Sequence, residues 1–81
     1  MFINKTSTGE NNICGKVIAE HRKRSGKSQR QLADALQLAG LDIDKNAIQR
    51  IECGKRFVTD IELVYIAKVL HLSFDQLLCQ L

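Results

Sequence analysis

Four polar side chains between residues 45 and 50 are the best candidates for binding chemistry in this 81-residue chain. They are Lys45, Asn46, Gln49 and Arg50. All four can donate hydrogen bonds, and in a helix they lie opposite Ile48 and Ile51, which are three residues apart and share one face. Such donors suit the oxygen atoms of a polyanion or the acceptor-rich edges of bases. The alternative is an ordinary solvated helix face, since polar residues are the default outer surface.

The local sequence must hold these side chains on a short helix, which we expect over residues 44–53. Asp44 can cap its N-terminus, because the carboxylate can accept hydrogen bonds from the free amides of the first turn. Ile43 and Ile48 match a hydrophobic staple around that cap. Gly54 suits the left-handed residue that ends a helix. Two cations follow directly, Lys55 and Arg56.

The positive charge of the chain is concentrated around this predicted helix. The whole chain carries 12 Lys and Arg against 9 Asp and Glu, a net charge of +3. Residues 16–56 hold ten of the cations and five of the anions, a net +5, whereas residues 57–81 hold one cation and three anions, a net −2. The central part is therefore the candidate surface for a polyanion. A role of the same surplus in solubility alone is the alternative.

Composition favours one small helical domain. A chain of this size buries only about 60% of its unfolded surface, so its core is small. Pro and Trp are absent, and hydrophobic residues make up 44% of the chain. No apolar run approaches the roughly 18 residues that span a bilayer, and the first residues lack the apolar segment of a secretory signal. We therefore expect a cytoplasmic protein with no membrane partner.

Residues that usually carry catalysis or bind metals are scattered. Cys14, Cys53 and Cys79 are widely spaced and form no CxxC motif, which argues against a disulfide framework and against a zinc site. Buried free thiols in a reducing compartment are the expected alternative. No nucleophile with a base at meaningful spacing, no phosphate loop and no metal-ligand set is found. The sequence thus predicts no enzyme, no cofactor, no metal site and no small-molecule substrate.

Four more helices are expected around the helix at 44–53. Residues 1–12 are polar and are expected to form a flexible tail, so that the domain covers residues 13–81. The other helices are expected over 13–25, from 28 to 38 or 39, and from 59 and 73 onward. Three capping boxes mark their starts: Ser28 with Gln31, Thr59 with Glu62, and Ser73 with Gln76. Gly40 suits the end of the second helix, with Leu41 folding back on Leu36.

Apolar residues recur at helical spacing and predict the core of an all-α fold. The expected buried positions are Ile18, Leu32, Ala33, Leu36, Ile48, Ile51, Leu63, Ile66, Ala67, Leu70, Leu77 and Leu78. Phe74 belongs to the last apolar stripe and is expected to pack with it. Leu81 is a candidate for the core or for an interface, and His21 is expected at the edge of the core.

Three ordered segments resemble the phage-repressor type of helix-turn-helix, the lambda-repressor/Cro-like or XRE family. They are RKRSGKSQRQLADAL, AIQRIECGKR and ELVYIAKVLHLSFDQLL. The resemblance covers about residues 14–80, and its signal is the ordered set SQxxLAxxL, IxxIExGKR and LxxIAxxLxxSxDxLL. It implies a compact five-helix lambda-repressor-like domain that binds double-stranded DNA.

The resemblance also implies roles for individual residues. Positions that face base edges or flanking phosphates in the family are matched by Lys45, Asn46, Gln49 and Arg50. Phosphate-contacting positions are matched by Gln29, Arg30, Lys55 and Arg56. Arg22 and Glu52 match a structural pair that ties the first helix to the third. Ala33 matches the small residue that lets the second helix approach the third.

The chain departs from the family at two places. The second Leu of helix two and the first Ile of helix three are usually seven apart, whereas Leu36 and Ile48 are twelve apart, so the turn is extended by five residues. His21 stands where the family usually has an aliphatic residue.

Two functional hypotheses follow. The first is a sequence-specific transcriptional regulator that reads the major groove with residues 44–53 and acts as a homodimer on an inverted repeat. The second is a protein-binding module, antitoxin- or adaptor-like, that uses the apolar residues Phe57, Val58 and Leu81. DNA binding weakens steeply with ionic strength, whereas an apolar protein contact does not, so salt dependence distinguishes the two.

Overall fold

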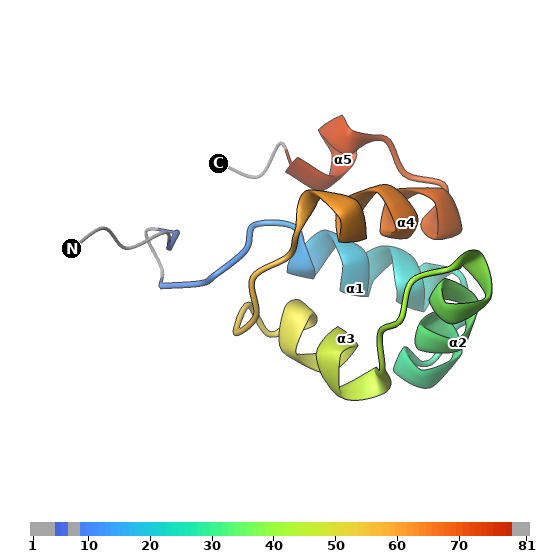
Figure 1. The fold of residues 1–81 in the computed structure, drawn as a ribbon. Helices are drawn as coiled ribbons and strands as arrows, with labels where there is room; N and C mark the ends of the chain where they lie inside the picture. Colours follow the sequence, from blue (N-terminus) through green and yellow to red (C-terminus); the bar gives the residue numbers. More distant parts are fainter. Residues whose placement is uncertain (1–4, 7–8, 79–81) are drawn as a thin grey trace.

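A computed structural model describes residues 5–6 and 9–78 of the chain. Within these residues there are five helices and no strand, which confirms the predicted all-α fold (Figure 1). The helices are α1 (Gly15–Arg24), α2 (Gln29–Ala39), α3 (Lys45–Glu52), α4 (Asp60–Leu70) and α5 (Phe74–Leu78). None of the helices in the described ranges has the length and apolar character required to cross a bilayer.

The helices enclose one core to which each of them contributes. α1 contacts α3, α4 and α5, α2 contacts α3 and α4, and α4 also contacts α5. Eight side chains are almost fully removed from solvent: Cys14, Ile18, Leu32, Leu36, Ile48, Ile51, Ile66 and Leu77. Seven of these belong to the predicted core, and the exception is Cys14. α3 therefore lies against α1 and α2 through its apolar side.

Side-chain caps form at the predicted helix starts. Ser28 Oγ accepts from the Gln31 amide at 3.0 Å, and the Gln31 side chain accepts from the Ser28 amide at 2.8 Å. Equivalent reciprocal bonds join Thr59 with Glu62 and Ser73 with Gln76. Because caps pair the amides that a helix start leaves free, they fix where α2, α4 and α5 begin.

The extended connection between α2 and α3 is fastened to the rest of the molecule. Gly40 has φ 113°, and Leu41 N–H donates to the Leu36 carbonyl at 2.9 Å, as in the predicted Schellman ending. The Gln37 side chain donates to the Ile43 carbonyl at 2.7 Å, and Ile43 itself is buried. The additional residues are therefore held by hydrogen bonds and by core packing.

The predicted burial is wrong at Phe74 and Leu78 of α5 and at Leu63 of α4. Leu78 and Phe74 are exposed, and Leu63 is only half-buried. α5 has five residues and rests on α1 and α4 with one side, which Leu77 covers. Phe74 and Leu78 are four residues apart, so they share another side of the helix. Leu81 and Cys79 lie outside the described residues.

Two further expectations need correction. We expected residues 1–12 to be a tail, but Asn11 and Asn12 are hydrogen-bonded to the segment that follows α3. We expected buried thiols, and Cys14 is buried, which raises the pKa of its thiol, but Cys53 is exposed. Cys53 is the residue after the last turn of α3, beyond the last buried position of that helix.

Candidate nucleic-acid interface

α3 presents a purely polar side to solvent. Asp44 Oδ1 accepts from the Ala47 amide at 2.8 Å, so the predicted cap forms. Ile48 and Ile51 are 1% and 0% exposed, which confirms the predicted inner face. The four side chains predicted to face outward are all exposed: Lys45, Asn46, Gln49 and Arg50. The burial of the two isoleucines thus determines which side chains are available to a ligand.

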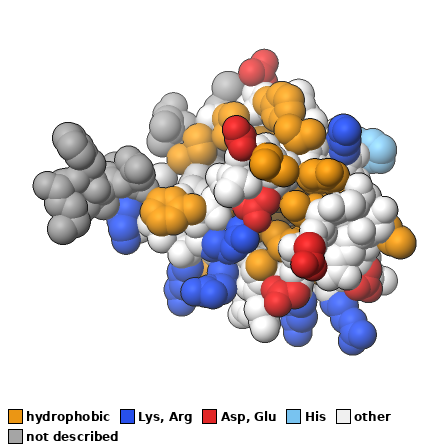
Figure 2. All heavy atoms as spheres, viewed as in Figure 1, with side chains coloured by type: hydrophobic (Ala, Val, Ile, Leu, Met, Phe, Trp, Pro, Cys, Tyr) orange, Lys and Arg blue, Asp and Glu red, His pale blue; other side chains and the backbone are white. Residues whose placement is uncertain are grey.

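The surface beside α3 carries much of the positive charge. In Figure 2, Lys and Arg side chains gather at the lower edge of the molecule, where Figure 1 places α3. A shallow hollow of about 370 Å³ at the C-terminal half of α3 is lined by Gln49, Arg50, Cys53 and Lys55. This part of the surface can accept an anion and can donate hydrogen bonds to it.

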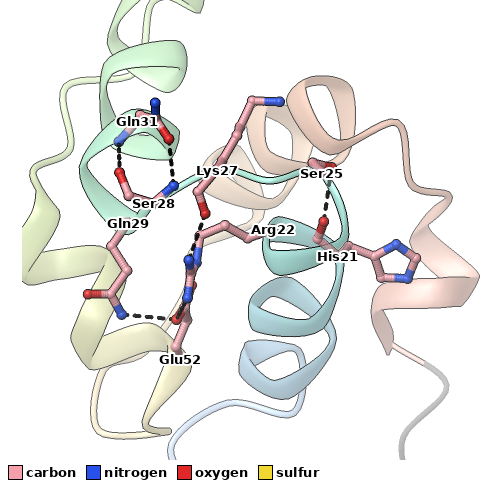
Figure 3. Close-up of polar contacts among 8 residues, drawn as sticks. All are labelled: His21, Arg22, Ser25, Lys27, Ser28, Gln29, Gln31 and Glu52. Carbon is pink, nitrogen blue, oxygen red and sulfur yellow. Dashed lines mark hydrogen bonds and ion pairs between the residues drawn. The ribbon is translucent and has the colours of Figure 1, made fainter.

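The predicted pair of Arg22 and Glu52 forms and ties α1 to α3 (Figure 3). Arg22 Nε lies 2.7 Å from Glu52 Oε2, and Arg22 Nη2 lies 3.0 Å from Glu52 Oε1. The third guanidinium nitrogen, Nη1, donates to the Lys27 carbonyl at 2.8 Å. The hydrogen bond with Glu52 raises the pKa of Arg22, although burial opposes this. The side chains are only 10% and 7% exposed, so the pair is internal.

Gln29 connects the same carboxylate to α2. Its Nε2 donates to Glu52 Oε1 at 3.0 Å, so α1, α2 and α3 meet at one acidic side chain (Figure 3). Gln29 is half-buried, while its neighbour Arg30 is exposed. The bond from Gln29 to Glu52 fixes the start of α2 relative to the C-terminal end of α3.

His21 is half-buried, and Figure 3 shows its ring on the other side of α1 from Arg22.

The two cations after α3 have different surroundings. Lys55 is exposed and has no ion-pair partner among the described residues. Arg56 is half-buried and makes two bonds to Glu62, from Nη1 to Oε1 at 3.0 Å and from Nη2 to Oε2 at 2.8 Å. The hydrogen bond from Arg56 lowers the pKa of Glu62, although burial opposes it. Much of the charge of Arg56 is therefore balanced inside the protein.

Sequence reasoning missed the two residues that hold the segment after α3. Asn12 Nδ2 donates to the carbonyls of Ile51, at 3.1 Å, and Arg56, at 2.8 Å. Asn11 donates to the carbonyls of Gly54, through its backbone at 2.7 Å, and Lys55, through its side chain at 3.0 Å. The sequence feature that could have identified them is the pair of consecutive Asn residues just before the first helix, because Asn is a frequent capping residue.

Two backbone donors of this segment point away from the asparagines. The C=O and N–H groups of a trans peptide point in opposite directions, and the chain has no cis peptide among the described residues. Since the carbonyls of Lys55 and Arg56 face the asparagines, the N–H groups of Arg56 and Phe57 face the other way. Neither N–H group donates a hydrogen bond within the described part of the chain.

The described residues contain no group of three His, Cys, Asp or Glu side chains arranged to hold a metal ion. The side chains at this surface are instead hydrogen-bond donors and cations, and the nearby acids Glu52 and Glu62 are bonded to arginines. The chemistry available at this surface is the binding of acceptors and negative charge.

Comparison with known families agrees with this arrangement. The family model HTH_3, described as helix-turn-helix, matches residues 18–77, which include nearly all of the five helices. Comparisons with curated proteins and with solved structures gave no significant match. The matched range contains the complete α2, the connection, and the complete α3. The chain therefore belongs to the HTH_3 helix-turn-helix family of DNA-binding regulators, whose members are typically not enzymes.

Proposed function

We propose that this protein is a sequence-specific transcriptional regulator that reads the major groove of double-stranded DNA with residues 44–53. The observation that supports this most is the division of α3 into two faces. Ile48 and Ile51 are buried, and every side chain on the opposite face can donate hydrogen bonds. A helix of this kind fits the major groove, where base edges present distinct patterns of acceptors and donors.

Base recognition is assigned to the exposed face of α3, formed by Lys45, Asn46, Gln49 and Arg50. Asn46 and Arg50 are four residues apart, so both can enter the same groove. Asn can pair with adenine through two hydrogen bonds, and Arg can pair with guanine in the same way. These contacts supply the sequence preference.

Backbone contacts are assigned to the start of α2 and to the segment after α3. The residues proposed to lie near phosphates are Gln29, Arg30, Lys55 and Arg56. Such contacts set the register of the protein on DNA without reading sequence. Lys55 offers a charge that no ion pair with another described residue balances, whereas Arg56 shares its charge with Glu62. The N–H groups of Arg56 and Phe57 add two neutral donors.

The regulator is proposed to bind as a homodimer on an inverted repeat, with the two α3 helices about 34 Å apart. The exposed apolar residues of α4, α5 and the segment before them form a candidate contact, here called the apolar face: Phe57, Ile61, Val64, Phe74 and Leu78. Figure 2 shows orange side chains over the upper part of the molecule, where Figure 1 places α4 and α5. These two helices lie on the other side of the molecule from α3, so their part of the apolar face can be occupied while α3 is bound to DNA. A cytoplasmic location is part of the same proposal.

The apolar face also favours the second candidate, a protein-binding module of the antitoxin or adaptor type. Exposed apolar patches of soluble proteins commonly mark sites of protein contact. Under this alternative the helix-turn-helix fold is a scaffold, and the polar face of α3 is only solvated. The two candidates differ in their response to salt, because only contacts to phosphates release condensed counterions.

The test is selection of duplexes from a random-sequence DNA pool, followed by affinity measurements across a salt series. We expect enrichment of one sequence with inverted symmetry and a steep linear fall of log affinity with log salt concentration. An unselected duplex of the same length is the control and should bind more weakly. Lack of enrichment, together with an affinity that does not depend on salt concentration, would contradict DNA recognition and favour the protein-binding module.

A further inference from the structure

We infer that Asn11 and Asn12 position the phosphate-contacting segment after α3, and that DNA affinity depends on them. This inference rests on the proposed function, since DNA is the ligand of that segment. We call these two residues, together with the carbonyl groups to which they donate hydrogen bonds, the clasp. The side-chain bonds of the clasp join residues 39–44 positions apart in the sequence.

Every hydrogen-bonding atom of the Asn12 amide is used. Its two Nδ2 hydrogens go to the carbonyls of Ile51 and Arg56, and its Oδ1 accepts from the Gly15 amide at 2.8 Å. A single planar group therefore links the start of α1, the end of α3 and the segment beyond it. Because the amide is rigid, the distance between the Ile51 and Arg56 carbonyls is set by its geometry.

Asn11 controls the backbone on both sides of Lys55. Its backbone N–H bonds the Gly54 carbonyl, which belongs to the peptide before Lys55. Its side chain bonds the Lys55 carbonyl, which belongs to the peptide after that residue. Fixing both peptide planes fixes φ and ψ of Lys55, and these determine the direction of its Cα–Cβ bond. The clasp thereby aims this exposed cation.

Two glycines provide the space that the clasp needs. A Cβ atom on Gly15 would overlap the Ile51 carbonyl oxygen, so α1 can begin against the end of α3 only without a side chain. A Cβ atom on Gly54 would lie 2.8 Å from Glu10 Cγ, so the segment before α1 packs directly over that glycine. These close approaches show that residues 10–12 are part of the surface around the end of α3.

The test uses Asn12→Ser and Asn11→Ala in the full chain. The new hydroxyl of the Asn12→Ser variant can still accept from the Gly15 amide three residues later, as Ser28 Oγ accepts from the Gln31 amide, but one short hydroxyl cannot replace the two amide donors. Asn11→Ala removes only the side-chain bond to the Lys55 carbonyl. Neither change alters the charge, so a change in salt dependence reflects the position of the segment that carries Lys55 and Arg56.

Each variant is titrated with the duplex selected by the unmodified chain, across a salt series, with and without Lys55→Ala. We expect each clasp variant to lower affinity by about threefold to tenfold, the effect of about one lost hydrogen bond or phosphate contact. The log–log salt slope should become shallower by as much as about one unit, as for Lys55→Ala. In the Lys55→Ala background the clasp variants should have little further effect, because they act on the same contact.

Ile66→Val is the matched control, since it removes one buried methylene group from α4 and leaves the clasp intact. Its effect on DNA affinity should be small and should add to that of Lys55→Ala. Circular dichroism and thermal unfolding establish that each variant is folded. If Asn12→Ser does not fold, Asn11→Ala decides the question, because it keeps every bond of Asn12.

The outcomes separate this inference from the function on which it rests. Binding by the unmodified chain, with clasp variants whose losses add fully to that of Lys55→Ala or are absent, would overturn the clasp and leave the DNA-binding function in place. Absence of salt-dependent DNA binding by the unmodified chain would overturn both. Shared, non-additive losses with a shallower slope support the clasp.

Discussion

Arg56 and Glu62 face each other across the start of α4, joined by hydrogen bonds of 3.0 and 2.8 Å. The same carboxylate accepts from the Thr59 amide at 2.9 Å, so it closes the capping box of α4 and holds the preceding segment at once. Because Glu62 is buried, its charge depends on these partners. The position of Arg56 is therefore coupled to the start of α4.

The ion pair makes the stability of the protein sensitive to acid. Arg56 lowers the pKa of Glu62 in the folded state. The resulting stabilisation is complete above the unfolded value of about 4.3 and is lost as pH falls from there through the lower folded value. Thermal unfolding between neutral pH and about pH 3 should show this loss in the unmodified chain and a smaller loss in Glu62→Gln.

Glu62→Gln retains the capping box, because Gln can also accept from the Thr59 amide. Glu20→Gln is the control for removal of a carboxylate, since Glu20 belongs to an exposed pair with Arg24. An acid response unchanged by Glu62→Gln would show that other groups dominate it.

Lys55 and Arg56 should behave differently when each is changed to Ala. Lys55→Ala should leave stability nearly unchanged and make the log–log salt slope of DNA binding shallower by about one unit. Arg56→Ala should weaken binding to all sequences alike and also destabilise the fold by about 1–3 kcal/mol, because it leaves Glu62 without its partner. Unfolding and DNA titrations of both variants check this, and equal stability of the two would contradict it.

The Arg22–Glu52 pair should matter far more to stability than an exposed ion pair, which contributes about 0–1 kcal/mol. Both side chains are internal, so Glu52→Ala leaves Arg22 Nε and Nη2 and Gln29 Nε2 without their acceptor, and only the bond from Arg22 Nη1 to the Lys27 carbonyl remains. We expect a loss of about 3–5 kcal/mol in the free energy of unfolding, measured with urea. The double change Arg22→Met with Glu52→Met should lose less than Glu52→Ala alone, since no buried charge then remains.

Asn46→Ala and Arg50→Ala should change sequence preference, because both residues lie on the exposed face of α3. Each should lower affinity for the selected duplex by about 1–3 kcal/mol and relax preference at one or two base pairs. Lys68→Ala removes an exposed charge from α4 and should leave preference unchanged. Repeating the selection with each variant is the measurement. If none of the α3 variants altered preference, α3 would not be the reading element.

The apolar face should be needed for dimer formation. Ile61 is 64% exposed on α4, and Ile61→Glu should shift sedimentation from dimer to monomer on the selected duplex. Leu38→Glu is the matched control, because Leu38 is 90% exposed but lies on α2. A monomer in the unmodified chain, both free and on DNA, would rule out the proposed dimer.

Structural features that depend on short stretches of sequence could be predicted from the sequence. The three capping boxes, the Asp44 cap and the glycine endings each depend on residues within about six positions, and all of them form. The inner face of α3 was also predictable, because Ile48 and Ile51 allow only one amphipathic orientation. The Arg22–Glu52 pair was predicted from the family resemblance, but its burial was not predicted.

Features that depend on which surfaces meet were not predictable. Phe74 and Leu78 have the same spacing as core residues, and only the packing of α5 on α1 and α4 decides that Leu77 is covered instead. The bonds of Asn12 to Ile51 and Arg56 span about forty residues, and no local sequence pattern predicts them. The partner of Arg56 lies nearer in the sequence, and it was already identified as a capping residue, Glu62.

The connection from Gly40 to Asp44 has a thermodynamic consequence for association. Its backbone is fastened through Leu41, its centre is packed through Ile43, and its end caps α3. The conformational entropy of this segment is therefore lost when the protein folds, and little remains to be lost when the helix enters a groove. The heat-capacity change on binding should then report the buried contact surface alone, without a contribution from coupled folding of the longer turn.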